Sequence, residues 1–303
     1  MDTNILLESG TNELEILEFS LGENHYGINV AKIREILQYQ HVTPVPNTHP
    51  SVEGIFMPRD TMITVINLRS CLGMPEGTAE GLFIITNFNK LDIAFHVDNV
   101  IGIHRVSWEE IIKPDSTINA SNGNSVSTGI IKMKERLVVI LDFESIVSAI
   151  SPETGLRVTD IDNLEERTRS NSRILIAEDS PLLSKLITDC LRKAGYQELI
   201  VTGNGQEAWE AICALKEEGT LLDKVQLIIT DIEMPQMDGH RLTKLCKSDD
   251  TIKKIPIVIF SSLVNEEMRR KGEQLVADAQ LTKPEIGMLV DAVDKLIADA
   301  NAK

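Results

Sequence analysis

The chain has 303 residues, 42% of them hydrophobic, and a net charge of −16 at pH 7. This length is sufficient for two ordinary domains, each with its own core. The acidic surplus argues against nucleic acid and anionic membranes as partners, because both bind clustered Lys and Arg. The N-terminus has no basic start leading into an apolar stretch, and no apolar run approaches the roughly 18 residues of a membrane span. We therefore expect a cytoplasmic protein without membrane insertion.

The four cysteines are widely spaced in the chain. They form no C-x-x-C pattern and have no histidine at metal-ligand spacing, so neither a zinc site nor a disulfide framework is indicated. We expect them to be small buried hydrophobic residues: Cys71, Cys190, Cys213 and Cys246.

Short strands are predicted throughout the first half of the chain. Residues 15–30 have the pattern of a hairpin around a Gly/Asn turn. Further strands are expected at 62–68, 82–87, 91–97 and 137–142, and one amphipathic helix at 31–37. Such spacing is typical of small closed barrels. Because this half shows no nucleophile, metal cluster or phosphate loop, we interpret it as a binding module.

The pattern changes near residues 150–172. Residues 151–155 contain Pro and Gly, which end the preceding strands, and residues 164–172 are polar and highly charged. Both features are typical of a linker or a short exposed helix. We place a first domain at 12–150, a linker at 151–171 and a second domain at 172–300.

In the second half, short apolar runs alternate with helical patterns. Strands are predicted at 173–177, 198–202, 225–230, 255–260 and 279–282. Helices are predicted at 182–194, 205–217, 239–247, 264–272 and 285–299. This alternation implies right-handed crossovers and one parallel sheet covered on both faces. The expected class is a doubly wound (βα)5 fold.

Polar side chains follow four of these strands at the point where each strand ends. Glu178 and Asp179 follow the first strand, Asp231 the third, Ser261 the fourth and Lys283 the fifth. The carboxyl ends of parallel strands meet at one edge of the sheet, where open α/β sheets place their ligands. We therefore expect these five side chains to converge.

The converging groups suit transfer of a phosphoryl group to a carboxylate. Asp179 and Asp231 can supply hard oxygen ligands to Mg²⁺, with Glu178 acting through water. Lys283 can hold a phosphate oxygen as a point charge, and the Ser261 hydroxyl can donate a hydrogen bond to another. Asp231 is the expected nucleophile. A carboxylate is a weak one, so charge neutralisation and in-line alignment must supply most of the rate.

This half resembles a response-regulator receiver domain over about residues 172–300. The resemblance rests on the pair Glu178-Asp179, the D-x-x-M-P-x-M-D-G stretch from Asp231 to Gly239, the hydroxyl residue Ser261 and Lys283-Pro284. It implies a flavodoxin-like fold and phosphorylation of Asp231 from a phosphohistidine of a sensor kinase. It also implies Mg²⁺ bound by Asp179, Asp231 and the backbone carbonyl of Glu233.

Three further residues of this half bear on the receiver resemblance or on the acceptor site. Gln280 stands where many receivers have a Tyr or Phe that acts as a rotameric switch, so the usual coupling between the hydroxyl residue and this aromatic side chain is not expected here. Glu233 places an extra acid two residues after the acceptor. His240 is expected to be a surface residue at a helix start and not a phosphorylation site.

The first half is similar to the CheW family of chemotaxis coupling proteins over about residues 12–150. The matching stretches are 26–30, 33–36, 43–47, 52–55, 65–69, 97–98 and 141–142. This resemblance implies two intertwined SH3-like barrels that bind the cytoplasmic tips of chemoreceptors and the regulatory domain of the kinase CheA. Arg59 stands where the family has the Arg of an Asn-Leu-Arg-Gly linked to receptor contact, although the surrounding residues 56–60 depart from that pattern.

A CheW-like module followed by a receiver resembles the CheV type of chemotaxis coupling protein. The implied function is coupling of chemoreceptors to CheA, regulated during adaptation by phosphorylation of Asp231, without enzymatic turnover. Three alternatives remain open. The receiver could be a phosphate sink, or the chain could be an Mg²⁺-dependent aspartyl-phosphate hydrolase with Glu233 as its second acid. A DNA-binding response regulator would need a basic output domain.

Overall fold

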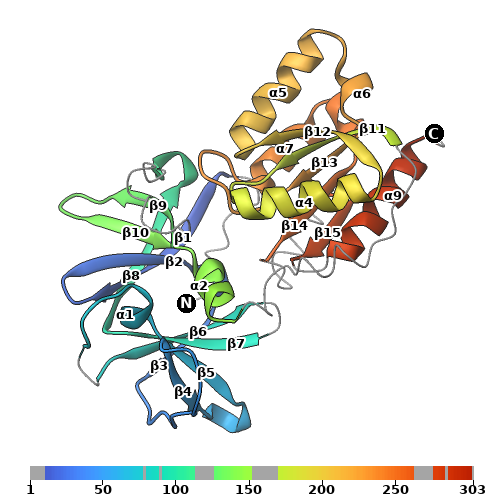
Figure 1. The fold of residues 1–303 in the computed structure, drawn as a ribbon. Coiled ribbons are helices and arrows are strands. Elements are labelled where there is room, and N and C mark those ends of the chain that lie inside the picture. The colour runs from blue at the N-terminus through green and yellow to red at the C-terminus, as the bar shows by residue number, and fades with distance from the viewer. Residues whose placement is uncertain are drawn as a thin grey trace. The chain divides into compact units, whose positions relative to one another are not determined.

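The computed structural model describes residues 11–77, 80–88, 91–112, 126–151, 170–262, 276–283 and 286–301. The chain splits into two compact units (Figure 1): one contains residues 14–106 and 110–155, the other residues 1–13, 107–109 and 156–303. The predicted helix at 264–272, most of the predicted linker at 151–171 and Pro284 lie outside the described residues.

Two five-stranded sheets make up the first unit. The first sheet has the order β8-β1-β2-β10-β9, with β1 Glu13–Leu21, β2 Asn24–Asn29, β8 Asn99–Ser107, β9 Ser127–Lys132 and β10 Leu137–Leu141. The second has the order β3-β6-β7-β5-β4, with β3 Ile33–Gln38, β4 Val52–Phe56, β5 Ile63–Asn67, β6 Leu82–Phe88 and β7 Leu91–Val97. In sequence, the whole second sheet is therefore inserted between β2 and β8 of the first.

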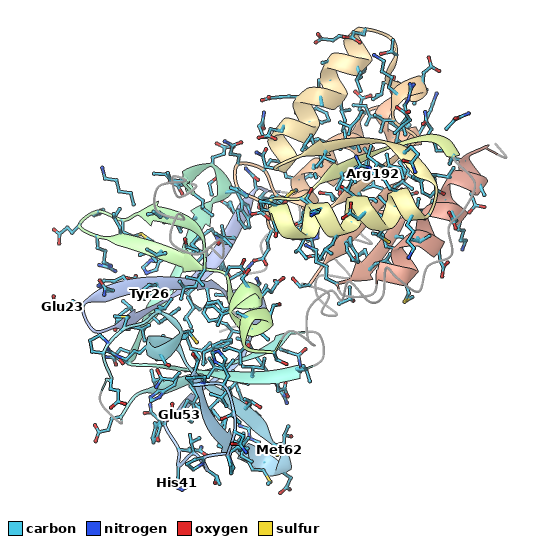
Figure 2. All side chains as sticks on the ribbon, in the orientation of Figure 1. Glu23, Tyr26, His41, Glu53, Met62 and Arg192 are labelled. Carbon is cyan, nitrogen blue, oxygen red and sulfur yellow. The ribbon has the colours of Figure 1, made fainter. Side chains whose placement is uncertain are left out.

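One hydrophobic core joins the two sheets. Apolar side chains of β1 and β2 pack with those of β5, β6 and β7 and with the helix α2 (Phe143–Ile150). Phe143 of α2 makes edge contacts with Phe19 of the first sheet and Phe95 of the second, at centroid distances of 6.2 and 4.6 Å. Tyr26, which is labelled in Figure 2, stacks on Phe19 at a centroid distance of 5.9 Å. The predicted all-β, CheW-like class of this half is confirmed.

The helix predicted at 31–37 is wrong. Residues Val30–Lys32 form one 3-10 turn, capped by the Asn29 side chain, and the chain then continues as the strand β3. Ile33, Ile36 and Leu37 have helical spacing, which favoured a helix, but β3 pairs along its length with β6. Pairing with a neighbouring strand satisfies the backbone groups of this segment, and tertiary pairing outweighs a short local pattern.

A buried ion pair links β1 to the turn between β9 and β10. The side chain of Glu18 is fully buried. Its Oε1 accepts a hydrogen bond from Arg136 Nε at 2.7 Å and its Oε2 accepts one from Arg136 Nη2 at 2.9 Å. These bonds to Arg136, with a weaker one to His25, outweigh the effect of burial and lower the pKa of Glu18 from 4.5 to about 2.

Replacement of Glu18 should therefore remove an acid-sensitive part of the stability. Because the folded pKa is depressed, the contribution of Glu18 is fully present above pH 4.5 and is lost as the pH falls toward about 2. We expect Glu18→Gln to lower the free energy of unfolding of this unit at pH 7 by about 1–3 kcal/mol. Urea titrations between pH 7 and pH 2 should show the wild-type and variant curves converging at the acid end; a constant gap would contradict this assignment.

The second unit has a single parallel sheet with the order β12-β11-β13-β14-β15. Its strands are β11 Ser170–Ala177, β12 Tyr196–Thr202, β13 Leu227–Thr230, β14 Ile257–Ser261 and β15 Ala279–Thr282. The principal helices are α4 Pro181–Lys193, α5 Gly205–Glu217, α7 Gly239–Ser248 and α9 Ile286–Asn301, with the short α6 at Leu221–Lys224. This is the strand order of flavodoxin-like folds, and the predicted doubly wound class is confirmed.

Alternate residues of the buried strands fill two separate cores. On β11, Ile174 and Ile176 pack with α4 and α9, whereas Leu175 and Ala177 pack with α5 and α7. A strand segment that is buried on both faces must be apolar, as residues 174–177 of this strand are. Of the four free cysteines, Cys190 and Cys246 are buried as predicted, and Cys71 and Cys213 are half-buried.

Candidate functional site

The acceptor candidate Asp231 lies directly beyond the last residue of β13. Its backbone N–H donates to the carbonyl of Ala177 at 3.0 Å, which continues the pairing of β13 with β11 past the end of the strand. The backbone N–H of Ile232 donates to Asp231 Oδ1 at 2.7 Å and holds the carboxylate in place. The second oxygen, Oδ2, faces Lys283.

Lys283 lies between two buried carboxylates. Its Nζ is 2.8 Å from Glu178 Oε2 and 3.0 Å from Asp231 Oδ2. All three residues are less than 10% exposed. The backbone N–H of Lys283 also donates to the carbonyl of Ser261, at 3.1 Å, and Ser261 itself is fully buried. The ends of β11, β13, β14 and β15 thus meet at one edge of the sheet, as the sequence predicts.

Three carboxylates at this edge could share a cation. An oxygen from each of Glu178, Asp179 and Asp231 lies within 4.8 Å of the other two. Burial is the main reason that the pKa of Glu178 is raised to about 7; the Asp231 charge acts in the same direction and Lys283 opposes it. A hard divalent cation would relieve this crowding of acids, because carboxylate oxygens are the ligands it prefers. The donor set therefore fits Mg²⁺.

Gly239 allows the acceptor loop to close tightly. Its backbone N–H donates to the carbonyl of Ile232 at 3.0 Å, and a Cβ built on Gly239 would lie 1.8 Å from the carbonyl oxygen of Asp231. No larger residue fits without displacing the acceptor. The expectation that His240 is exposed is wrong, since it is only 6% exposed: the close approach at Gly239 draws the first turn of α7 into the protein.

The remaining predicted residues of the second unit lie close to the same edge or on its strands. Glu233 is half-buried in the acceptor loop, two residues after Asp231. Gln280 is half-buried on β15 and is paired with Ile259 of β14. The hydrogen bond from the backbone N–H of Ile232 to Asp231 was not predicted, because any residue type supplies the same main-chain donor.

Arg59 belongs to the other unit, at the turn between β4 and β5. It has a left-handed conformation with φ 51°, and the next residue, Asp60, has φ 65°. The Arg59 side chain is 80% exposed, with Nη2 3.3 Å from Glu35 Oε2. Asp60 stands where the Asn-Leu-Arg-Gly pattern has Gly, and Asp tolerates this conformation better than most residues. The turn thus has a glycine-like backbone without the glycine.

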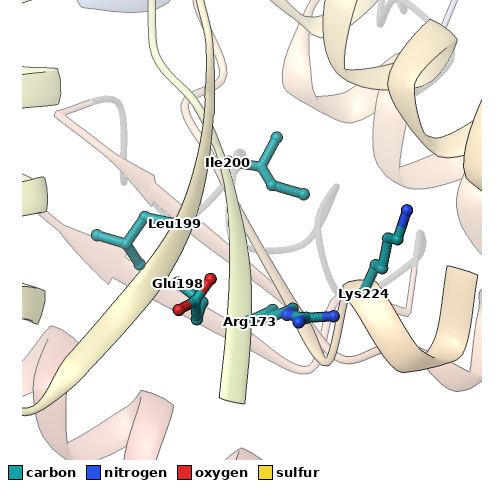
Figure 3. Close-up of a pocket in the computed structure, with 5 residues that line it drawn as sticks. All are labelled: Arg173, Glu198, Leu199, Ile200 and Lys224. Carbon is teal, nitrogen blue, oxygen red and sulfur yellow. The ribbon is translucent and has the colours of Figure 1, made fainter. Parts of the chain in front are cut away.

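A separate cavity of about 180 Å³ lies near the start of β11 and β12 (Figure 3). It is lined by Arg173, Glu198, Leu199, Ile200 and Lys224. Arg173 and Glu198 are paired residues near the beginnings of their strands, whereas the acidic cluster follows the strand ends. The cavity is therefore not part of the candidate site.

Two family models match the chain. Residues 15–151 match the CheW-like domain, and residues 174–294 match the response regulator receiver domain. The chain therefore combines a CheW-like domain with a receiver domain.

This order of domains is of the CheV type, and known proteins of that type align along almost the whole chain. The chain is 27% identical to chemotaxis protein CheV3 of Helicobacter pylori over 96% of each chain. It is 27% identical to CheV1 of the same organism, over 90% of this chain and 89% of the relative. Chemotaxis protein CheW of Thermotoga maritima is 28% identical and covers 50% of this chain with 98% of its own length.

Within the part of the chain that the structure describes, no helix combines the length and apolar character needed to span a membrane.

Proposed function

We propose that this protein couples chemoreceptors to the histidine kinase CheA and that phosphorylation of Asp231 regulates the coupling. The observation that carries the proposal is the arrangement of Asp231, Lys283 and Glu178 in a domain joined to a CheW-like domain. A coupling module without regulation would have no use for a buried acceptor carboxylate with its own lysine.

The geometry supports transfer of a phosphoryl group to Asp231. The Asp231 carboxylate attacks the phosphorus of a phosphohistidine, a P–O bond forms, and the P–N bond breaks with its electron pair left on the imidazole. Lys283 Nζ, 3.0 Å from Asp231 Oδ2, is placed to pair with a phosphoryl oxygen. Ser261 is the last residue of the adjacent strand β14, and its hydroxyl can donate a hydrogen bond to another phosphoryl oxygen.

Magnesium fits the same arrangement. Glu178, Asp179 and Asp231, with the backbone carbonyl of Glu233, would hold the ion. When bound, Mg²⁺ would neutralise negative charge on the incoming phosphoryl oxygens. Lys283 would then exchange its contact with Glu178 for one with the phosphoryl group.

The proposal is tested by receptor-stimulated CheA activity with this protein as the sole coupler. The unmodified protein is compared with protein loaded with Mg²⁺ and beryllofluoride, a mimic of the phosphoryl group. We expect the loaded protein to give either a higher or a lower kinase activity than the unmodified protein. Equal activity in both forms would contradict regulation, and no activity in either form would contradict coupling.

A phosphate sink is the closest alternative. In that case CheA loses phosphoryl groups to Asp231 while coupling is unchanged, so the two functions separate in the same assay. A hydrolase would release phosphate over many turnovers from a small-molecule donor, whereas a receiver keeps at most one phosphoryl group per chain.

Arg59 provides a test of the coupling surface. The turn that carries it is flanked by Met57 and Met62, which are 64% and 66% exposed; Met62 is labelled in Figure 2. We expect Arg59→Ala to weaken binding to receptor or CheA severalfold in a pull-down assay. Its effect on the free energy of unfolding should stay within about 0.5 kcal/mol, because an exposed ion pair contributes little.

Arg34→Ala is a matched control for Arg59→Ala. Arg34 lies on β3, in the same sheet, is 52% exposed and pairs with Asp92. The Arg34→Ala variant should bind receptor and CheA as the wild type does. Equal loss in the two variants would indicate a general effect of charge and would contradict a specific role for the Arg59 turn.

A further inference from the structure

Asn12, the residue that precedes β1, is buried although its side chain is polar. It is 7% exposed and has a left-handed backbone with φ 64°. Among residues other than Gly, Asn and Asp adopt this conformation most readily. Residues 1–13 and 107–109 belong to the same compact unit as the parallel sheet. A buried polar side chain needs hydrogen-bond partners, and Asn12 finds them in this unit.

The Asn12 side chain bonds to the loop that follows the acceptor, residues 232–238. Its Nδ2 donates to the carbonyl of Gln236 at 2.8 Å, and its Oδ1 accepts from the backbone N–H of Asp238 at 3.0 Å. Nδ2 also lies 3.5 Å from Glu109 Oε1. The amide satisfies two main-chain groups of the loop, as a neighbouring strand would. One side chain therefore fixes two residues of the loop.

Main-chain bonds join the same loop to Trp108, the residue that follows β8. The N–H of Gln236 donates to the Trp108 carbonyl at 3.1 Å, and the N–H of Trp108 donates to the Asn12 carbonyl at 3.0 Å. Gln236 has φ 69°, a left-handed conformation that is unfavourable for Gln and persists only where the surrounding contacts hold it. The shape of the loop at this point therefore depends on Asn12 and Trp108.

The beginning of this loop contacts the acceptor carboxylate. The N–H of Ile232 donates to Asp231 Oδ1 at 2.7 Å. The carbonyl of Ile232 accepts from the N–H of Gly239 at 3.0 Å, and Gly239 directly follows Asp238. The two ends of the loop are thus bonded to each other. A phosphoryl group on Asp231 would add negative charge beside these bonds, so a displacement of Ile232 would also act on Asp238.

A movement of the loop would reach two strands through the chain itself. Asn12 is followed directly by Glu13, the first residue of β1, and Trp108 directly follows Ser107, the last residue of β8. The strands β1 and β8 are neighbours in one sheet. Because Asn12 and Trp108 are also bonded to each other, they would move together and shift both strands at this end.

We propose that Asn12 transmits the phosphorylation state of Asp231 to the strands β1 and β8. The inference rests on the proposed function and adds the route by which phosphorylation reaches the CheW-like domain. In the unmodified protein, Asn12 holds Gln236 and Asp238 in the arrangement described above. When phosphorylation shifts the loop, these bonds carry the shift to the ends of the two strands.

Hydrogen exchange of the full chain, followed by mass spectrometry, tests this route. The protein is measured unmodified and after loading with Mg²⁺ and beryllofluoride. In the wild type, we expect loading to change exchange severalfold at residues 232–238, at the start of β1 and at the end of β8. Asn12→Gly removes the side-chain bonds without straining the left-handed backbone. In this variant the loop should still respond, while the response of the two strands should fall severalfold.

Asn47→Gly is the matched control. Asn47 is also left-handed, with φ 58°, but it is exposed and lies between β3 and β4. This variant should respond as the wild type does. Asn12→Asp keeps the oxygen that accepts from Asp238 but loses the donor to Gln236, so it should give an intermediate response of the two strands.

A wild-type response at residues 232–238 without one at the two strands would overturn the inference and leave the proposed regulation to the kinase assay. A full response of both strands in Asn12→Gly would also overturn it. The absence of any response in the wild type would contradict phosphorylation of Asp231 itself, and the inference with it. If Asn12→Gly does not fold, the wild type and Asn12→Asp decide.

Discussion

Asp231→Asn should abolish phosphoryl transfer to this protein. The amide keeps the size and hydrogen-bonding oxygen of the acceptor, but it is not a nucleophile toward phosphorus. Incubation with CheA that carries a radiolabelled phosphoryl group should transfer at most one phosphoryl group to each wild-type chain. The label incorporated into the variant should be lower by at least about 100-fold. In Asp231→Asn, beryllofluoride should no longer change kinase activity, while the variant should still couple receptors to the kinase as the unmodified wild type does.

Asp189→Asn is the matched control for this experiment. Asp189 lies on α4 of the same domain and is exposed, away from the strand ends. It should accept phosphate at the wild-type rate. Labelling that persists in Asp231→Asn would show that another side chain accepts the phosphoryl group and would remove the basis of the proposed regulation.

Lys283→Met should cost stability as well as the phosphorylation response. The substitution leaves Glu178 and Asp231 buried side by side without the lysine that now contacts both. Removing one partner from a buried ion cluster typically costs about 3–5 kcal/mol. Urea unfolding without magnesium should show a loss of this order in the receiver domain. Addition of MgCl₂ should recover part of it, because the cation would replace the missing charge.

Lys185→Met separates this effect from a general loss of positive charge. Lys185 is an exposed residue of α4, and its replacement should change the free energy of unfolding by less than about 0.5 kcal/mol. If Lys283→Met loses no more than this control, the lysine is not the counter-ion of the two acids. If it loses stability but magnesium restores nothing, the acids do not bind the cation.

The candidate site could be predicted from sequence because strand ends determine it. Asp231 follows the mostly apolar, fully buried strand β13 and Lys283 follows the half-buried strand β15, and parallel strands bring such positions to one edge. No long-range detail was needed. The direct contact of Glu178 with Lys283 was not predicted, since Glu178 was expected to act through water on Mg²⁺ and the pairing depends on side-chain placement.

The coupling domain was harder to predict. The segment at 31–37 has both helical spacing and β-branched residues, and only the presence of β6 as a neighbour decides for a strand. No element was predicted at the strands β4, β8 and β9. The contacts of Glu18 with His25, His104 and Arg136 join β1, β2, β8 and a distant turn, so they depend on register between strands that are far apart in sequence.

The insertion of the second sheet into the first limits how the coupling domain can be dissected. Strands β1 and β2 precede the second sheet in sequence and β8, β9 and β10 follow it, while Phe19, Phe95 and Phe143 meet in the shared core. A fragment that ends after β7 would lack three strands of the first sheet and would expose this aromatic cluster. Truncations will therefore report misfolding and not the location of a partner. Binding faces on this domain must be mapped with surface point substitutions in the intact chain.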